Sequence, residues 1–236
     1  MVIPGNLLLG LFLILVLMLV GSVARYQQGR ELEVLSPVYQ GPEESQLVSL
    51  TFNVDWGSEY LPGLLELLDQ HQTEVTFFLT GGWMEKNPEL LHSLFEAGHQ
   101  LENHGYRHLH PNSLTEEEVC QLIEKNSQLL EEELGVESSY FAPPYGEYND
   151  QVLRVADELN HTLIMWTVDS IDWQRPEPEI IQQRVLEGIE GGAIVLLHPT
   201  APTLEAMEGL IISIKERGYR LVTLSEMLTG SPGGGD

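Results

Sequence analysis

Short apolar runs alternate with helical patterns along most of this chain. The strand candidates, most of them apolar, lie at 47–54, 74–79, 100–103, 139–142, 163–168, 193–197 and 220–223. The helical patterns lie at 61–70, 88–97, 115–134, 150–159, 178–187 and 204–217. Alternation of this kind predicts an α/β fold with a parallel sheet and crossover helices. About seven repeats favour a barrel over an open sheet, so functional side chains are expected just after the strands.

The two ends of the chain differ from this pattern. Leu7 to Val23 is almost unbroken apolar sequence, and Ser22-Val23-Ala24 resembles a signal-peptide cleavage site. Residues 1–25 therefore predict a signal peptide or a membrane anchor, and an extracytoplasmic protein that is secreted or anchored to the cell membrane. Polar, Pro-containing sequence predicts a linker at 26–46, and Gly-rich sequence predicts a disordered tail at 230–236. One domain is expected between them, at 47–229.

The charge of the chain disfavours polyanionic partners. Acidic residues number 36 against 11 Lys and Arg, which gives a net charge of −25. A surface this acidic argues against nucleic acid and against docking on anionic lipid. The sequence does not define an oligomeric state.

Two histidines, His104 and His108, lie four residues apart, and Asp55 follows the first apolar run. Two imidazoles and one carboxylate form a donor set for zinc or a similar ion, with positions left for water and substrate. A metal site of that kind carries out hydrolysis. The alternatives are two surface histidines and an Asp that caps a turn before Gly57.

Three further segments carry groups that can take part in chemistry. The loop Phe141–Gly146 contains two prolines and a glycine, and such a rigid loop can present a backbone N–H to an oxyanion. The stretch from Trp166 to Trp173 places two carboxylates between two indoles, which serve either for sugar stacking or for core packing. His198 ends a strongly apolar run, where it is either a general acid or base or a hydrogen-bonded rim residue.

Taken in this order, the segments resemble the NodB-homology polysaccharide deacetylases, carbohydrate esterase family 4, over residues 47–228. The Trp-Gly and Ala-Pro-Pro variants and the apolar N-terminus are similar to the sporulation-associated branch of that family. The resemblance implies a distorted (β/α) barrel and one divalent metal, with zinc expected and cobalt or another ion as alternatives. It also implies removal of acetyl groups from an amino-sugar polysaccharide of the cell envelope, peptidoglycan or a chitin-like polymer.

The resemblance also implies roles for individual residues. Asp55, His104 and His108 correspond to the metal ligands, and the backbone N–H of Tyr145 corresponds to the oxyanion donor. His198 corresponds to the catalytic acid, with Asp169 as its supporting carboxylate and Asp172 as the second candidate. Substrate contacts are expected at Pro144, Tyr145 and Trp173.

The chain departs from the family pattern at two positions. Asn53 stands where the family has the Asp that acts as catalytic base, in a segment one residue longer than usual. Ala142 stands where the family has the Arg that holds that Asp. Either the base is now His198, Asp169 or Glu147, or the protein binds cell-wall glycan without fast turnover in an envelope or sporulation role. A small-amide hydrolase on the same scaffold is the third hypothesis.

Overall fold

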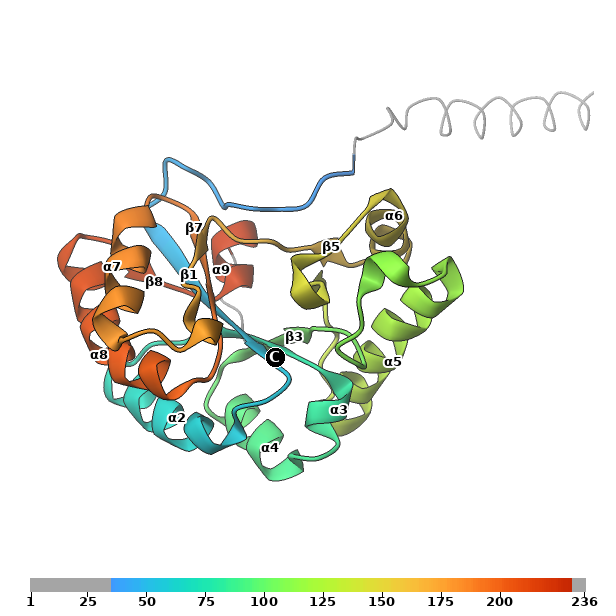
Figure 1. Ribbon diagram of the computed structural model, residues 1–236, viewed down its shortest axis with the longest axis horizontal. Helices are drawn as coiled ribbons and strands as arrows, with labels where there is room; N and C mark the ends of the chain where they lie inside the picture. Colours follow the sequence, from blue (N-terminus) through green and yellow to red (C-terminus); the bar gives the residue numbers. More distant parts are fainter. Residues whose placement is uncertain (1–34, 231–236) are drawn as a thin grey trace, which may run out of the picture. The chain divides into compact units, whose positions relative to one another are not determined.

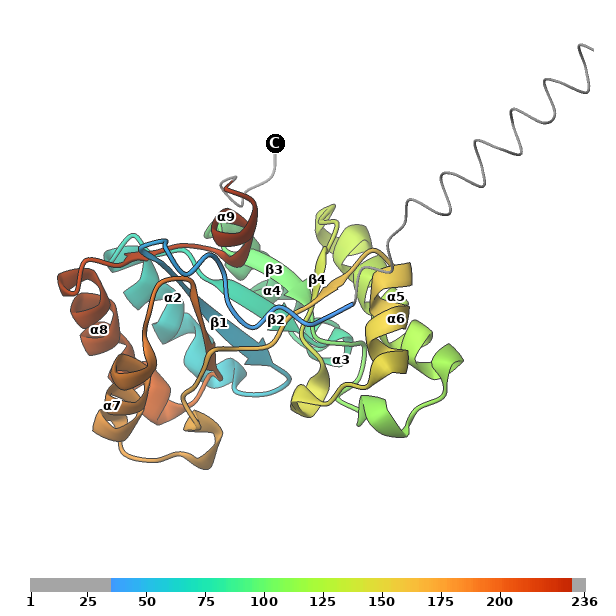
Figure 2. The same cartoon turned by 90° about the horizontal axis from the view of Figure 1, so that it is seen from above.

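A parallel sheet forms the centre of the domain, which begins at residue 36 in a computed structural model that describes residues 35–230. The strands are β1 (Leu47–Val54), β2 (Thr76–Leu79), β3 (Gln100–Asn103), β4 (Tyr140–Phe141), β5 (Thr162–Leu163), β6 (Val168–Asp169), β7 (Ala193–Leu197) and β8 (Arg220–Leu221). Their order is β5-β4-β3-β2-β1-β7-β6, and β8 pairs with the start of β1. The sheet curls into a half-barrel with β5 and β6 at its edges (Figure 2). The predicted distorted barrel is therefore confirmed.

Helices cover the outer face of this sheet (Figure 1). They are α2 (Leu61–Gln70), α3 (Gly81–Met84), α4 (Pro88–Glu96), α5 (Glu116–Leu134), α6 (Asp150–Glu158), α7 (Pro178–Gly188), α8 (Ala201–Glu216) and α9 (Leu224–Thr229). Local sequence explains where several begin: α4 and α7 have proline in their first turn, and Thr115 forms a capping box with Glu118 at the start of α5. β1 lies between β2 and β7, and helices cover the outer face of the sheet. Val48 to Val54 of β1 are therefore buried.

The apolar run 163–168 is not one strand, which corrects the prediction made for it. Its start belongs to β5 and its end to β6, on opposite edges of the sheet. Between them, Met165 N donates to Val38 O and Thr167 N donates to Ile194 O. An apolar run suits the interior of a curled sheet whether or not its backbone continues a ladder, so hydrophobicity alone does not reveal the break.

Residues 36–41 form a segment, here called the N-terminal strap, that joins the two halves of the open barrel. Val38 forms a bridge with Ile164, next to β5, and Gln40 forms a bridge with Ala193 of β7. Within the predicted linker at 26–46, residues 36–46 lie in the same compact unit as the domain. A polar composition does not exclude pairing when the partner groups are backbone atoms at a sheet edge.

Several predictions concern residues outside the described range. The signal peptide or anchor at 1–25, the first part of the linker and residues 231–236 all lie there. Gly230, the first residue of the predicted tail, ends α9 in a left-handed conformation. Within residues 35–230, no helix has both the length and the apolar character needed to cross a membrane.

Candidate active site

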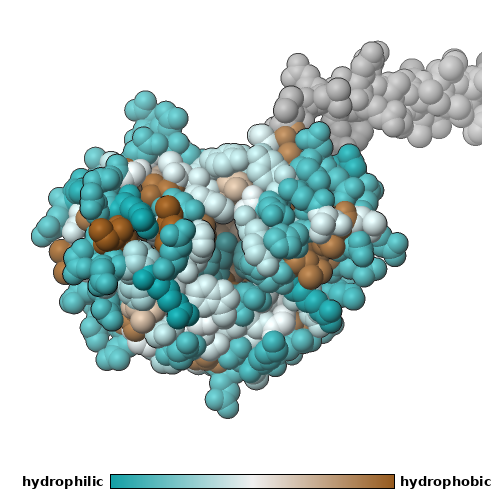
Figure 3. Space-filling view, in the orientation of Figure 1, coloured by the Kyte–Doolittle hydropathy of each residue, from teal (hydrophilic) through white to brown (hydrophobic). Residues whose placement is uncertain are grey.

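A cavity of about 470 Å³ opens at the carboxyl ends of the strands. The space-filling view shows the centre of this face hollowed (Figure 3). The residues lining the cavity are Asn53, Asp55, Trp56, His104, His108, Tyr145, Gly146, Trp166, Asp169, Trp173, Leu196 and His198. The sheet thus brings together nearly all the predicted site residues. Pro144 is buried and does not line the cavity, and neither do the alternative candidates Asp172 and Glu147.

His104 is held in one orientation and one protonation state. Its Nδ1 lies 2.7 Å from Ala142 O, and because a carbonyl can only accept, Nδ1 carries the proton and Nε2 keeps its lone pair. Burial lowers the pKa of His104 to about 3, so the ring is neutral at pH 7. Burial also lowers the pKa of His108, although the nearby Asp55 carboxylate opposes that shift. The two imidazole centroids are 5.1 Å apart.

The donor types in this corner of the cavity fit a divalent metal. Asp55 contributes a carboxylate, positioned by a 2.8 Å hydrogen bond from Thr80 Oγ1, and the two histidines contribute neutral rings. A backbone carbonyl on the far nitrogen, as at His104, is a usual support for a metal-binding imidazole. As the side chains stand, no group of three His, Cys, Asp or Glu within residues 35–230 is arranged to hold an ion. Binding by this set would therefore require side-chain adjustment.

Tyr145 occupies an unusual backbone conformation at the cavity rim. It lies in the short η3 helix (Pro144–Gly146) with φ 59° and ψ 6°, a left-handed conformation that is uncommon for a bulky residue. Its ring stacks on His110, with centroids 3.9 Å apart, and meets the edge of His108 at 4.3 Å. The side chain is 54% exposed. The loop therefore presents an aromatic face beside the two histidines, a place where strain is often retained for function.

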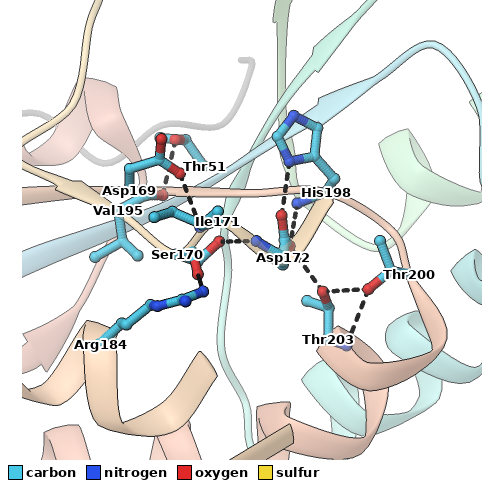
Figure 4. A network of polar contacts seen from close by, with 10 residues as sticks. All are labelled: Thr51, Asp169, Ser170, Ile171, Asp172, Arg184, Val195, His198, Thr200 and Thr203. Carbon is cyan, nitrogen blue, oxygen red and sulfur yellow. Dashed lines mark hydrogen bonds and ion pairs between the residues drawn. The ribbon is translucent and has the colours of Figure 1, made fainter. Parts of the chain in front are cut away.

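Asp172, rather than Asp169, is the carboxylate that supports His198, which corrects the order of the two candidates. Asp172 Oδ1 lies 2.8 Å from His198 Nδ1, and Oδ2 accepts from His198 N at 2.7 Å (Figure 4). Thr203 Oγ1 donates to the same Oδ2 at 2.7 Å, and the Asp172 side chain is fully buried. Asp169 instead accepts from Ile171 N and faces the cavity. The turn after β6 places the later carboxylate beneath the histidine.

Trp56 is a site residue that the sequence interpretation passed over. Its ring lies parallel to that of His198, with centroids 5.9 Å apart and an interplanar angle of 2°. The next residue, Gly57, has φ 85°, and a Cβ there would meet Pro199 O at 2.2 Å. Only glycine lets this loop approach so closely. The position of Trp56 directly after Asp55 was the available signal.

No carboxylate occupies the position of the usual base. Asn53 lines the cavity and is 7% exposed, and Ala142 is 4% exposed. Of the substitute bases considered, His198 and Asp169 line the cavity. Glu147 does not line the cavity, and its carboxylate lies 3.1 Å from His110 Nδ1 instead. The geometry thus leaves two candidates for a relocated base.

Comparison with known proteins identifies the family. Residues 40–164 match the family model for polysaccharide deacetylases. The uncharacterized protein YlxY of Bacillus subtilis (strain 168) is 41% identical over 192 residues, which cover 81% of this chain. The same alignment spans only 60% of YlxY, so this chain corresponds to part of that longer relative.

Three solved structures are similar to this fold. BA3943, described as a CE4 family pseudoenzyme from Bacillus anthracis, has a TM-score of 0.80 at 40% identity, covering 82% of this chain and 69% of that one. A mutant of BA3943 with restored enzymatic activity matches at 38% identity with the same TM-score, covering 82% of this chain and 71% of the mutant. The peptidoglycan N-acetylglucosamine deacetylase Bc1960 has a TM-score of 0.81 at 31% identity, covering 85% of this chain and 96% of that one. With a family model matched over more than half of its length, this chain belongs to the polysaccharide deacetylase family, carbohydrate esterase family 4.

Proposed function

We propose that this protein is a metal-dependent deacetylase that removes acetyl groups from the amino sugars of peptidoglycan. The observation that carries the proposal is the cavity itself, which collects Asp55, the two histidines of the predicted metal set and His198 with its buried partner. The likeness to Bc1960 supports acetylated glucosamine in peptidoglycan as the substrate class. A chitin-like polymer offers the same chemical group and serves as a test substrate.

Asp55, His104 and His108 would hold the metal, with zinc expected and cobalt as an alternative. When bound, a divalent metal polarises the acetyl carbonyl and lowers the pKa of a water molecule. The chain prepares for this role by keeping the His104 ring neutral and its Nε2 lone pair free. The set contributes one negative charge, which leaves a positive charge at the site once a divalent ion binds.

His198 would exchange a proton with the departing amine. Asp172 receives the Nδ1–H bond, so Nε2 is the ring nitrogen left to act toward the cavity. Asp172 also orients the ring, because its buried carboxylate lies 2.8 Å from Nδ1. Trp173, which is 52% exposed, and the ring of Tyr145 would flank the sugar, and the Tyr145 backbone N–H would face the oxyanion.

The cell envelope is the proposed location. Peptidoglycan lies outside the cytoplasmic membrane, and the apolar N-terminal run at Leu7 to Val23 would export the domain or anchor it. The strong negative charge is compatible with that setting, since it disfavours nucleic acid as a partner.

A glycan-binding protein with little turnover is the second candidate. The observation in its favour is the pair Asn53 and Ala142, which removes the usual base and its Arg partner from the cavity. The likeness to a CE4 pseudoenzyme points the same way. Loss of general-base assistance costs ~10²–10⁴ in rate. Slow hydrolysis and simple binding are therefore to be separated by experiment.

The test measures acetate release from N-acetylglucosamine oligomers and from purified peptidoglycan by the zinc-loaded protein. Release that is abolished by His198→Ala and by removal of the metal supports a deacetylase. Retained binding of the oligomers, with no release above the His198→Ala background, favours the glycan-binding candidate. Absence of both binding and release would overturn the proposal and leave a small-amide substrate to be tried.

A further inference from the structure

We propose that Arg175 recognises a carboxylate on the glycan, so that the site prefers an amino-sugar polymer bearing acidic groups over an uncharged one. The inference rests on the proposed function and narrows its substrate class. In peptidoglycan, the lactyl group of N-acetylmuramic acid and the attached peptides are the sources of such carboxylates. A chitin-like oligomer has none.

Within the part of the chain that the structure describes, Arg175 forms no ion pair, and it lies at the rim of the cavity. Its side chain is exposed, and its guanidinium carbon lies 6.0 Å from the ring centroid of Trp56, a cavity-lining residue. Among residues 35–230, the ion pairs formed by arginine involve Arg154 and Arg220. A protein with a net charge of −25 repels an acidic polymer. A free guanidinium at the mouth of the site offsets that repulsion where the polymer binds.

The turn that carries Arg175 also carries two other site residues. The η4 helix (Asp172–Gln174) is flanked by Ile171 with φ 54° and Arg175 with φ 53°. Two left-handed non-glycine residues, one of them β-branched, make this a strained turn. Arg175 N donates to Asp172 O at 2.8 Å, which closes it. The carboxylate below His198 and the exposed ring of Trp173 are thereby fixed to the same backbone as the guanidinium.

Trp56 connects the guanidinium to the reacting end of the cavity. Its ring is parallel to the imidazole of His198, and its centroid lies 6.0 Å from the guanidinium carbon of Arg175. Contact with an aromatic face limits the conformations of an exposed arginine. The planar guanidinium matches a carboxylate through two parallel hydrogen bonds.

The experiment compares the affinity of the full protein for three oligosaccharides of equal length, by calorimetry or tryptophan fluorescence. They are an N-acetylglucosamine oligomer, a peptide-free oligomer alternating with N-acetylmuramic acid, and the same oligomer carrying stem peptides. We expect the wild type to bind a carboxylate-bearing oligomer about tenfold more tightly than the neutral one, the effect of one charge-assisted pair. Arg175→Gln should remove that preference, measured as the ratio of the affinities for the acidic and neutral oligomers within each protein. Added salt should weaken the preference.

Arg154→Gln is the matched control, because Arg154 is exposed, pairs with Glu116, and neither residue lines the cavity. It should keep the full preference. Tighter binding of the peptide-free oligomer assigns the lactyl carboxylate, and tighter binding of the peptide-bearing one assigns a peptide carboxylate. Equal affinity of the wild type for all three, or a preference that survives Arg175→Gln, overturns this inference while leaving the deacetylase proposal intact. No binding of any oligomer overturns both.

Discussion

In the family pattern, the residues at positions 53 and 142 are an Asp that acts as base and the Arg that holds it. Here these positions are Asn53 and Ala142, and both are buried. Asn53→Asp alone would bury a carboxylate without a partner, and Ala142→Arg alone would bury a guanidinium without one. An uncompensated buried charge costs about 3–5 kcal/mol. The two changes together allow an ion pair to form, so their effects should not be additive.

We therefore predict that Asn53→Asp with Ala142→Arg deacetylates ~10²–10⁴ times faster than the wild type, the usual contribution of a general base. The double variant should also be more stable than the sum of the single variants implies. Acetate release and urea unfolding of all four proteins measure both quantities. The recovery of activity in a BA3943 mutant is in keeping with this expectation. A double variant no better than the additive singles would show that the positions are not coupled.

The two carboxylates after β6 have different surroundings, which leads to a second prediction. Asp172 accepts from three donors, whereas Asp169 accepts from Ile171 N at the cavity wall. In the Asn53→Asp, Ala142→Arg background, Asp172→Asn should lower kcat by ~10²–10⁴ because His198 loses its charged partner. Asp169→Asn is the control and should change kcat less than about tenfold, as its role would be polar contact alone. Equal effects of the two substitutions would contradict the assignment of Asp172.

At the scale of elements, the N-terminal strap depends on a close backbone approach at the start of β7. Gly192 has φ 76°, and a Cβ there would lie 2.6 Å from the carbonyl carbon of Gly41. The Gly41 N–H donates to Gly192 O at 2.8 Å. Gly218 is also left-handed, with φ 87°, but a Cβ there would meet nothing within 4 Å. An alanine at Gly218 would therefore cost backbone strain alone, whereas an alanine at Gly192 would cost backbone strain and displacement of the strap.

We predict that Gly218→Ala lowers the free energy of unfolding by about 1–2 kcal/mol, the cost of a left-handed alanine. Gly192→Ala should cost clearly more, because the strap must also move. Urea denaturation gives the two free energies, and hydrogen exchange at the Gly41 and Met165 amides reports whether the strap has opened. Equal losses of stability with unchanged exchange would mean that the strap does not depend on this contact.

At the scale of the whole molecule, buried ionisable groups make stability depend on pH in two opposing ways. Burial lowers the pKa of His99 from 6.5 to about 4, and that of His104 to about 3. The unfolded chain therefore binds protons that the folded protein excludes, and stability falls as the pH drops from 6.5 toward 4. Burial raises the pKa of Glu102 from 4.5 to about 7. Here the folded protein keeps a proton, so this group stabilises the fold as the pH drops from 7 to 4.5.

The histidines outnumber the single carboxylate, so the net stability should fall on acidification below pH 6.5. Glu102→Gln removes the opposing contribution, and its loss of stability between pH 7.5 and 4.5 should exceed that of the wild type by up to about 3 kcal/mol. Urea denaturation at three pH values measures the difference between the two proteins. Parallel pH profiles would show that Glu102 is ionised in the folded state at neutral pH.

Much of the fold could be predicted because its signals are local. The bounds of β1, β7 and α2 agree with the predicted ranges, since each is an apolar or amphipathic run flanked by polar residues or glycine. The bounds of β3 also agree, although Leu101 is its one apolar residue. The positions of the site residues after strands follow from the same alternation. The short helices α3 and α9 were not predicted, because a single turn has too little periodicity to detect.

The sequence by itself therefore determined the strand–helix alternation, the family and the set of side chains that meet at the strand ends. Only the tertiary structure decided which of two carboxylates binds His198, where the 163–168 run divides, and how Trp56 lies on the histidine. These outcomes depend on contacts between segments far apart in the chain and on single turn dihedrals, such as φ 54° at Ile171. The local pattern of apolar residues predicts neither these long-range contacts nor these dihedral angles. Because the strands of a curled sheet end around one cavity, small changes in the dihedral angles of the turns decide which side chains point into it.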